Sequence, residues 1–263
     1  MKTCVFTLLP VESKRLLGRA VAQMACVQRA YQHGRLIVAG GTTNAYVLEE
    51  LTGEPVAKGS YTAGVITEGV ACVTDATTRQ APAVFVNGAR VERPWLEVLQ
   101  EFTADDVFVK GANAIDLAGN AGVLVGAANG GTIGQAMGYL AASGARLIMP
   151  VGLEKLVPDV GQAAAVMGQK QIDQHWGMAC GLYVVTTGQI ITEIEALAGL
   201  FCVEATAVAA GGVAGSEGAI TLAVQGNEEA ITAVTELVCE LKEEQPFTVE
   251  KRNCQECSNP CAR

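Results

Sequence analysis

Apolar residues follow a helical period near the N-terminus and then give way to short buried runs. From Ser13 to His33 they recur every three or four positions, which predicts one amphipathic helix that Ser13 caps. An apolar run at 35–39 predicts a buried strand. The glycine-rich stretch 40–44 follows at once, and a second helix is predicted over 45–51. This strand, glycine loop and helix form the first informative unit of the chain.

The same alternation continues to about residue 150. Asn87-Gly88 lies between two apolar runs and predicts a β-hairpin, since both residues tolerate the positive φ angles of a type I′ turn. The other predicted elements here are helices at 95–102 and 133–142 and strands at 106–109, 122–125 and 146–149. Strands that alternate with helices and glycine loops indicate an α/β fold whose parallel sheet is covered on both faces.

A different order of elements is predicted from about residue 181. Strands at 182–186, 202–208, 219–224 and 247–250 are interleaved with helices at 191–200 and from Asn227 onward. The order β-α-β-β-α-β is typical of a ferredoxin-like α+β lobe. We therefore divide the chain into a parallel-sheet domain at 1–175, a ferredoxin-like domain at 176–252 and a short cysteine-containing tail at 253–263.

Composition narrows the class of partner. The net charge of −9 comes without any cluster of Lys and Arg, which argues against a nucleic-acid binder. The uncharged stretch 117–145 is interrupted by Asn120, Asn129 and a glycine pair, so we do not expect it to cross a membrane. The N-terminal apolar patch is too short for a signal peptide, which favours a cytoplasmic protein. A chain that is 50% hydrophobic is also expected to form a homo-oligomer.

Three of the nine cysteines cluster at the C-terminus, as Cys254-x-x-Cys257-x-x-x-Cys261. Thiolates at these spacings can reach one metal centre. A fourth ligand would come from Cys4, another scattered cysteine, a second subunit or a substrate. Zinc, an iron–sulfur cluster and a redox-active tail without metal all stay open. The six scattered cysteines are expected as small buried residues in a reducing compartment.

The loop after the first predicted strand has the features of an anion site. Glycines let a backbone approach a ligand closely, and a helix N-terminus offers unpaired N–H groups and partial positive charge. The residues concerned are Gly40, Gly41, Thr42, Thr43 and Asn44. The loop matches neither a dinucleotide fingerprint nor a P-loop, so a nucleotide is not specifically indicated. A tight turn without a ligand is the alternative.

Several segments resemble ribose-5-phosphate isomerase A. Residues 37–51 resemble its phosphate loop and the following helix, and residues 110–116 resemble its Asp-Gly-Ala-Asp-Glu active-site segment. Residues 126–132 are similar to its later glycine-rich loop, and 149–157 resemble the turn near its phosphate site. The wider superfamily, with glucosamine-6-phosphate deaminase and CoA transferases, implies a Rossmann-like sheet in the first domain and a ferredoxin-like lobe after it.

The resemblance fails at the catalytic carboxylates. Lys110 and Asn113 stand where the isomerase segment has its two aspartates, and Asp116 lies three residues further on. The family's lysine before the glycine-rich loop has no counterpart, and Gln135 is the polar residue nearest to its glutamate. Moving a proton between two sugar carbons requires a carboxylate base. Isomerisation by the usual route is therefore not expected, although the phosphate-binding half of the site can persist.

Four loops are expected to converge, because loops that follow parallel strands share one edge of the sheet. The predicted ligand-binding residues are Gly40, Gly41, Thr42, Thr43, Asn44, Asn113, Asn129, Gly130, Gly131, Thr132, Gln135 and Lys155. Lys110 and Asp116 are the predicted catalytic residues, with Lys110 as an anion partner, a base or a Schiff-base amine. A salt bridge from Lys110 to Asp106 or Asp116 is the alternative.

The functional hypothesis is a protein that binds a small phosphorylated or carboxylated metabolite. An isomerase-like or transferase-like activity is one version of it, and a non-catalytic metabolite sensor is another. A third possibility is an accessory protein that carries zinc or an iron–sulfur cluster on its C-terminal cysteines. The partner expected in the first two cases is a small anion, with neither nucleic acid nor membrane involved.

Overall fold

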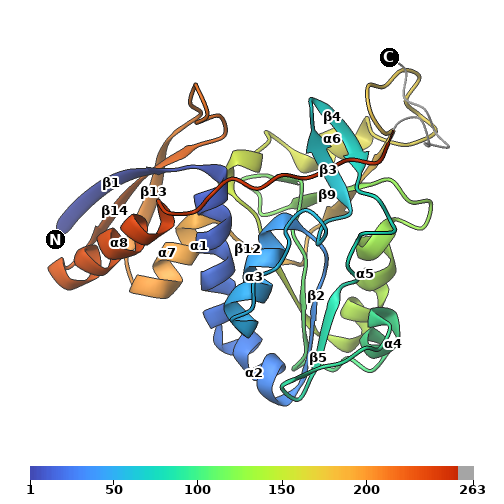
Figure 1. Cartoon of the computed structure of the whole chain (residues 1–263), viewed down its shortest axis with the longest axis horizontal. Helices are drawn as coiled ribbons and strands as arrows, with labels where there is room; N and C mark the ends of the chain where they lie inside the picture. Colours follow the sequence, from blue (N-terminus) through green and yellow to red (C-terminus); the bar gives the residue numbers. More distant parts are fainter. Residues whose placement is uncertain (254–263) are drawn as a thin grey trace.

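The computed structural model describes residues 1–253, so the predicted metal ligands Cys254, Cys257 and Cys261 lie outside the described residues. A six-stranded sheet runs through the larger part of the molecule (Figure 1). Its strands are, in spatial order, β12 (Gln189–Ile191), β10 (Arg146–Pro150), β7 (Val107–Val109), β2 (Arg35–Val38), β5 (Ala83–Val86) and β6 (Ala89–Arg90). The first four are parallel, β5 is antiparallel to β2, and β6 is antiparallel to β5. The α/β class is confirmed, and the sheet is mixed.

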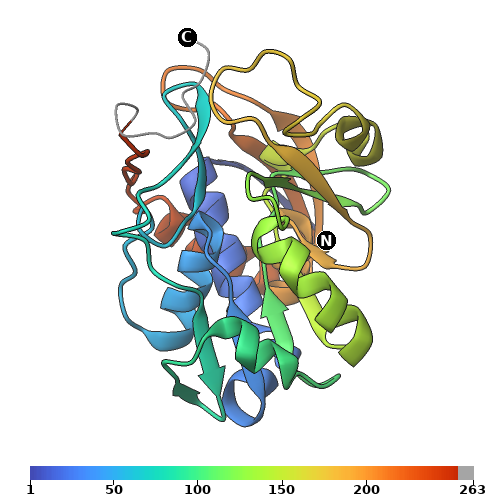
Figure 2. The ribbon, with the colours of Figure 1, turned by 90° about the vertical axis from the view of Figure 1, so that its right-hand side faces the viewer.

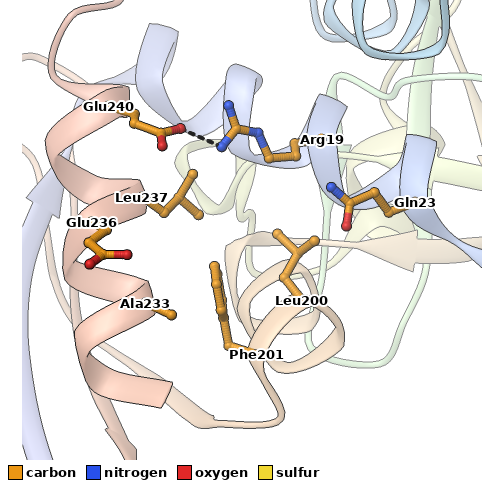
Figure 3. Close-up of a pocket in the computed structure, with 8 residues that line it drawn as sticks. All are labelled: Arg19, Gln23, Leu200, Phe201, Ala233, Glu236, Leu237 and Glu240. Atoms are coloured by element: carbon orange, nitrogen blue, oxygen red, sulfur yellow. Dashed lines mark hydrogen bonds and ion pairs between the residues drawn. The ribbon is translucent and has the colours of Figure 1, made fainter. Parts of the chain in front are cut away.

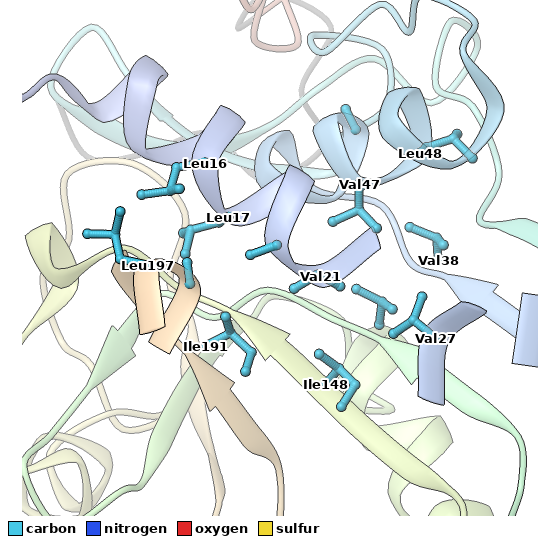
Figure 4. Packing of buried hydrophobic residues seen from close by; sticks show 14 of the residues in the cluster. Leu16, Leu17, Val21, Val27, Val38, Val47, Leu48, Ile148, Ile191 and Leu197 are labelled. Carbon is cyan, nitrogen blue, oxygen red and sulfur yellow. The ribbon is translucent and has the colours of Figure 1, made fainter. Parts of the chain in front are cut away.

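Helices cover both faces of this sheet. Leu36 and Val38 belong to a buried cluster on one face, while Ile37 between them belongs to the cluster on the other, as the alternation of a strand requires. The first face is covered by α1 (Pro10–Gln23), α2 (Ala25–His33) and α3 (Thr42–Thr52), whose packing Figure 4 shows. The second face is covered by α4 (Trp95–Gln100) and α5 (Gly131–Ser143), on the opposite side in Figure 2.

The helix predicted from Ser13 to His33 is two helices. The chain leaves the helical conformation at Met24, where ψ is 131°, and Ser13 is buried inside α1 instead of capping it. Helix α1 lies against α3 at very short range, because a Cβ on Gly18 would lie 2.6 Å from Cβ of Tyr46. Helix α3 begins at Thr42, three residues earlier than predicted, so the helix N-terminus falls directly on the glycine loop.

A smaller three-stranded antiparallel sheet lies to the side (left in Figure 1). It contains β1 (Lys2–Leu8), β14 (Ile220–Gly226) and β13 (Glu204–Ala210), covered by α7 (Glu193–Phe201) and α8 (Glu228–Leu241). The strand predicted at 247–250 is not formed, and β1 from the N-terminus pairs with β14 instead. Its alternating inward residues Cys4, Phe6 and Leu8 pack on the core, whereas Phe247 packs its ring edge against Tyr46.

Two further small sheets lie above the ends of the parallel strands in Figure 1. One contains β8 (Ala114–Ile115), β9 (Ala121–Val125) and β11 (Gly181–Val185), and the other is the hairpin of β3 (Gly64–Thr67) and β4 (Val70–Val73). The 3-10 turn η1 (Leu153–Lys155) and the short helix α6 (Val160–Ala165) complete this region. Strand pairing crosses residue 175 repeatedly, since β1 joins β14 and both β11 and β12 join strands from the first domain. Within residues 1–253, no helix combines the length and the apolarity that a membrane crossing requires.

Candidate functional site

The N-terminus of α3 is the first component of the site. Its N-cap is Gly41, and no side chain caps the helix. The N–H of Gly41 donates to the carbonyl of Tyr61 at 2.7 Å. The next three amides, those of Thr42, Thr43 and Asn44, have no acceptor within residues 1–253. Unpaired N–H groups of this kind are the part of a helix that attracts anions.

Asn44 ties the first loop to the second. Its side chain is fully buried, and Nδ2 donates to the carbonyl of Ala39 at 2.8 Å and of Val109 at 3.5 Å. These two acceptors fix the orientation of the amide, which leaves Oδ1 on the side of Gly111 without any hydrogen-bond partner in the described chain. A buried acceptor without a donor lowers the stability of the folded protein by about 1–3 kcal/mol. A ligand that donates a hydrogen bond to Oδ1 would remove this cost.

Lys110 and Lys155 place two ammonium groups on the same short piece of backbone. Lys110 directly follows β7, and its Nζ donates to the carbonyl of Gly111 at 3.1 Å. Lys155 ends η1, and its Nζ donates to the carbonyl of the next residue, Ala112, at 3.2 Å. Neither ammonium group has a carboxylate oxygen within 4 Å anywhere from residue 1 to residue 253. The predicted salt bridge from Lys110 to Asp106 or Asp116 is therefore not formed.

Both lysines carry a displaced pKa. Burial and, to a smaller extent, the neighbouring charge of Lys155 together lower the pKa of Lys110 to about 8. Burial also lowers the pKa of Lys155, against a smaller opposing effect of Glu154. The charges of Glu154 and Glu193 act on Lys155 from beyond 4 Å, so neither partly buried ammonium group has a carboxylate in direct contact within the described residues. Two like charges in this position favour the binding of an anion between them.

Asp116 stabilises its own loop and does not contact either lysine. Its carboxylate accepts hydrogen bonds at 3.0 Å from the amides of Ala118, Asn120 and Val160 and from the Asn120 side chain. These bonds, with that of Val160 the largest, lower the pKa of Asp116 to about 2. A carboxylate that accepts this many hydrogen bonds is a poor proton acceptor. The observed role of Asp116 is therefore to stabilise the conformation of its loop.

We expect Asp116→Asn to change the acid stability of the protein. The folded pKa of about 2 lies below the ordinary 3.8, so the stabilisation is present above pH 4 and is lost as the pH falls from about 4 to 2. The wild type should therefore lose more stability over that range than the variant. Urea unfolding at a series of pH values measures this, and parallel curves for the two proteins would contradict it.

The third predicted loop is built from local bonds. Gly130 and Gly131 both have positive φ, 75° and 61°, where a side chain would be strained. Asn129 Oδ1 accepts from the Gly131 amide at 3.0 Å, and Gln135 Nε2 donates to the Gly131 carbonyl at 3.2 Å. No hydrogen bond that the described residues form links this loop, including Thr132, to α3 or to the two lysines.

The exposed Asn113 is likewise engaged locally, since its Oδ1 accepts from the amide of Leu124 at 3.0 Å. Of the four predicted loops, the structure thus joins three: the start of α3, the Lys110–Ala112 segment and the Lys155 turn.

Glu193 is a site residue that the sequence pattern did not indicate. It is the first residue of α7, is fully buried, and accepts the amide of Leu153 at 2.9 Å through Oε2. Its other oxygen has no partner of ordinary hydrogen-bond geometry in the described chain, although the Ser13 hydroxyl acts on the carboxyl to lower its pKa. Burial is the larger effect and raises the pKa of this carboxyl overall. Because Leu153 opens the turn that carries Lys155, Glu193 attaches this turn to α7. The available signal was the capping box of Thr192 and Glu195, which fixes the helix start and hence the burial of Glu193.

A groove of about 260 Å³ lies elsewhere, between α1, α7 and α8 (Figure 3). Its apolar floor is Leu200, Phe201 and Leu237, and its cation, Arg19, is paired with Glu240 at 2.7 Å. An arginine whose charge is already neutralised by a carboxylate attracts an anion only weakly. The groove is therefore a poorer candidate for an anion site than the lysine pair.

Comparisons with known proteins assign no family to this arrangement. No family model matches the chain, and neither a curated protein nor a solved structure matches it significantly.

Proposed function

We propose that the protein binds a small phosphorylated or carboxylated metabolite at the carboxyl ends of β2, β7 and β10. The observation that carries the proposal is the pair of partly buried ammonium groups, Lys110 and Lys155, which have no carboxylate within 4 Å in the part of the chain described. The unpaired amides at the start of α3 add donors, and Oδ1 of Asn44 adds one buried acceptor. An anionic head group with a neighbouring hydroxyl satisfies all three requirements.

The fold supports this proposal at the level of analogy. We propose that the six-stranded sheet is Rossmann-like and that the smaller lobe is a ferredoxin-like variant with β1 in place of a C-terminal strand. Membership in the superfamily of ribose-5-phosphate isomerase A and the CoA transferases is part of the same proposal. So are a cytoplasmic location and a homo-oligomeric state, and neither nucleic acid nor a membrane is a partner in it.

Lys110 favours a second function, amine chemistry on a carbonyl-bearing ligand. With a pKa of about 8, a substantial fraction of its Nζ is unprotonated in mildly alkaline solution. In such a reaction the amine attacks the carbonyl carbon, water leaves, and a Schiff base forms. Reduction with borohydride would trap it as a stable secondary amine, which a mass measurement places on Lys110. The same ligand with Lys110→Met would give no adduct if the assignment is right.

A thermal-shift and calorimetric screen tests the binding proposal. Inorganic phosphate, sugar phosphates, dicarboxylates, acyl-CoAs and nucleotides are compared, since a ligand that binds only the folded state raises its stability. We expect a phosphorylated or carboxylated compound to bind, and Lys110→Met and Lys155→Met each to weaken it by at least about tenfold. The control is Lys170→Met, an exposed lysine outside the site, which should bind as the wild type does. Equal affinity in all four proteins would reject the site.

A further inference from the structure

The smaller sheet has one covered face and one open face. Its strands β1, β14 and β13 contact α7 and α8, which lie on the same side of the sheet (Figure 1). Phe6, Leu222 and Ala205 face the core on that side. Because side chains alternate along a strand, the residues between them point to the other face. The residues of this open face are Thr3, Val5, Thr7, Glu204, Thr206, Ala209, Thr221, Ala223 and Gln225.

Charge is confined to one corner of the open face. Glu204 begins β13, whereas the central row of cross-strand partners, Val5, Ala223 and Thr206, is uncharged. Val5 is nevertheless 63% exposed. A centre without charge and a polar margin are features of protein interfaces. The open face therefore has the composition of a surface that another protein covers.

The partner that fits this face best is a second copy of it. The chain has a net charge of −9, so two copies repel each other least where their surfaces carry no charge. The open face has no lysine or arginine with which to attract a more acidic partner or an anionic lipid surface. Its threonine hydroxyls can both donate and accept hydrogen bonds, so a threonine-rich face is complementary to itself across a two-fold axis.

The position of Glu204 selects one orientation of the two copies. An axis along β14 places β1 of one copy over β13 of the other, and Glu204 then lies opposite Thr3 of the second copy. Gln225 Nε2 donates to Thr3 Oγ1 at 3.3 Å, which leaves the Thr3 hydroxyl hydrogen free to bind that carboxylate. An axis across the strands would place Glu204 opposite Ala209, whose side chain has no donor, and a buried carboxylate without a donor is unfavourable.

We propose that the open face is a dimer interface, in which two copies of the face pack on each other about a two-fold axis along β14. This inference rests on the homo-oligomeric state proposed above and is independent of the anion site. Three strands about 4.8 Å apart, with about 3.4 Å per residue, give a face of about 14 by 24 Å. This area is smaller than the roughly 800 Å² that each partner buries in a standard complex, so we expect a weak dimer with a Kd of about 10–100 μM.

Sedimentation equilibrium of the full chain, between about 1 and 500 μM, tests the interface through the Kd of the dimer. In the proposed arrangement Val5 of one copy lies opposite Thr206 of the other. Val5→Lys/Thr206→Lys therefore brings like charges together and should raise the Kd at least about tenfold. Val5→Lys/Thr206→Glu brings opposite charges together and should dimerise with a Kd within about threefold of the wild type.

Two further double variants complete the design. Thr7→Lys/Ala209→Lys repeats the like-charge test in the next row of the sheet, where these two exposed residues face each other across the axis. Ile66→Lys/Val166→Lys is the matched control, since it adds the same charge at two exposed apolar residues outside the face, and should leave the Kd unchanged. Circular dichroism and urea unfolding show that each variant is folded.

The possible failures are distinguishable. A wild-type chain that stays monomeric at every concentration would overturn both the interface and the proposed oligomeric state. A wild-type dimer that both like-charge variants leave intact would overturn the interface alone. Loss of the dimer in Val5→Lys/Thr206→Glu as well as in Val5→Lys/Thr206→Lys would overturn the axis along β14.

Discussion

Lys110→Met should unfold at a higher urea concentration than the wild type when no ligand is present. Methionine keeps the apolar stem and removes the ammonium group, which is desolvated, lies near Lys155 and has no carboxylate within 4 Å in the described residues. The fall in pKa from 10.5 to about 8 corresponds to about 3 kcal/mol, and we expect about 1–3 kcal/mol of added stability at pH 7. Most substitutions destabilise, so a gain here would mark a residue retained for function.

The pH dependence of this gain separates it from a packing effect. Below pH 8 the lysine is charged in both the folded and the unfolded chain, and the full destabilisation is present. Between pH 8 and 10.5 the folded protein loses the proton first, so the wild type becomes more stable relative to Lys110→Met as the pH rises. Urea unfolding at pH 7 and pH 10 measures the difference. A variant that is less stable at both pH values would show that the ammonium group is satisfied and not strained.

Glu193→Ala should lower the free energy of unfolding by about 2–4 kcal/mol. The change deletes the acceptor of the Leu153 amide and leaves a cavity at a fully buried position. It also frees the turn that carries Lys155 from α7, so we expect weaker binding of the anion in the same variant. Chemical denaturation and calorimetry provide the two measurements.

Glu193→Gln is the matched control because its amide oxygen can still accept the Leu153 N–H. Burial raises the pKa of the Glu193 carboxyl, so in the wild type stability falls as the pH rises from about 4.5 through that raised value. The glutamine variant lacks this loss and should be at least as stable as the wild type at pH 7. If glutamine were as damaging as alanine, the carboxylate charge itself would be needed, contrary to this interpretation.

The part of the site that follows strictly local rules could be predicted from the sequence. An apolar run, two glycines and a helical period predict that α3 follows directly after β2. A second apolar run predicts that Lys110 follows directly after β7. Because β2, β7 and β10 are parallel, their loops necessarily meet at one edge. The convergence of Asn44, Lys110 and Lys155 is a consequence of these three facts.

What could not be predicted depends on contacts far apart in the chain. Lys2–Leu8 alternates as a strand, but its partner β14 is more than 200 residues away, and nothing local indicates the pairing. Asp116 is predicted as a site residue because it lies close to Lys110 in the sequence. In the structure its carboxylate accepts the amide of Val160, a distant residue, and so holds the loop together. In the sequence Glu193 is an acidic residue at the start of a helix, as is common. Its role depends on its hydrogen bond with Leu153, which is 40 residues away in the chain.

Diffraction from crystals grown with tungstate, a heavy analogue of phosphate, tests the central claim most directly. We expect an anomalous peak within hydrogen-bonding distance of Nζ of Lys110, Nζ of Lys155 and an amide at the start of α3. An ordered site in which the two lysines instead pair with carboxylates, or tungstate bound only elsewhere on the protein, would contradict it.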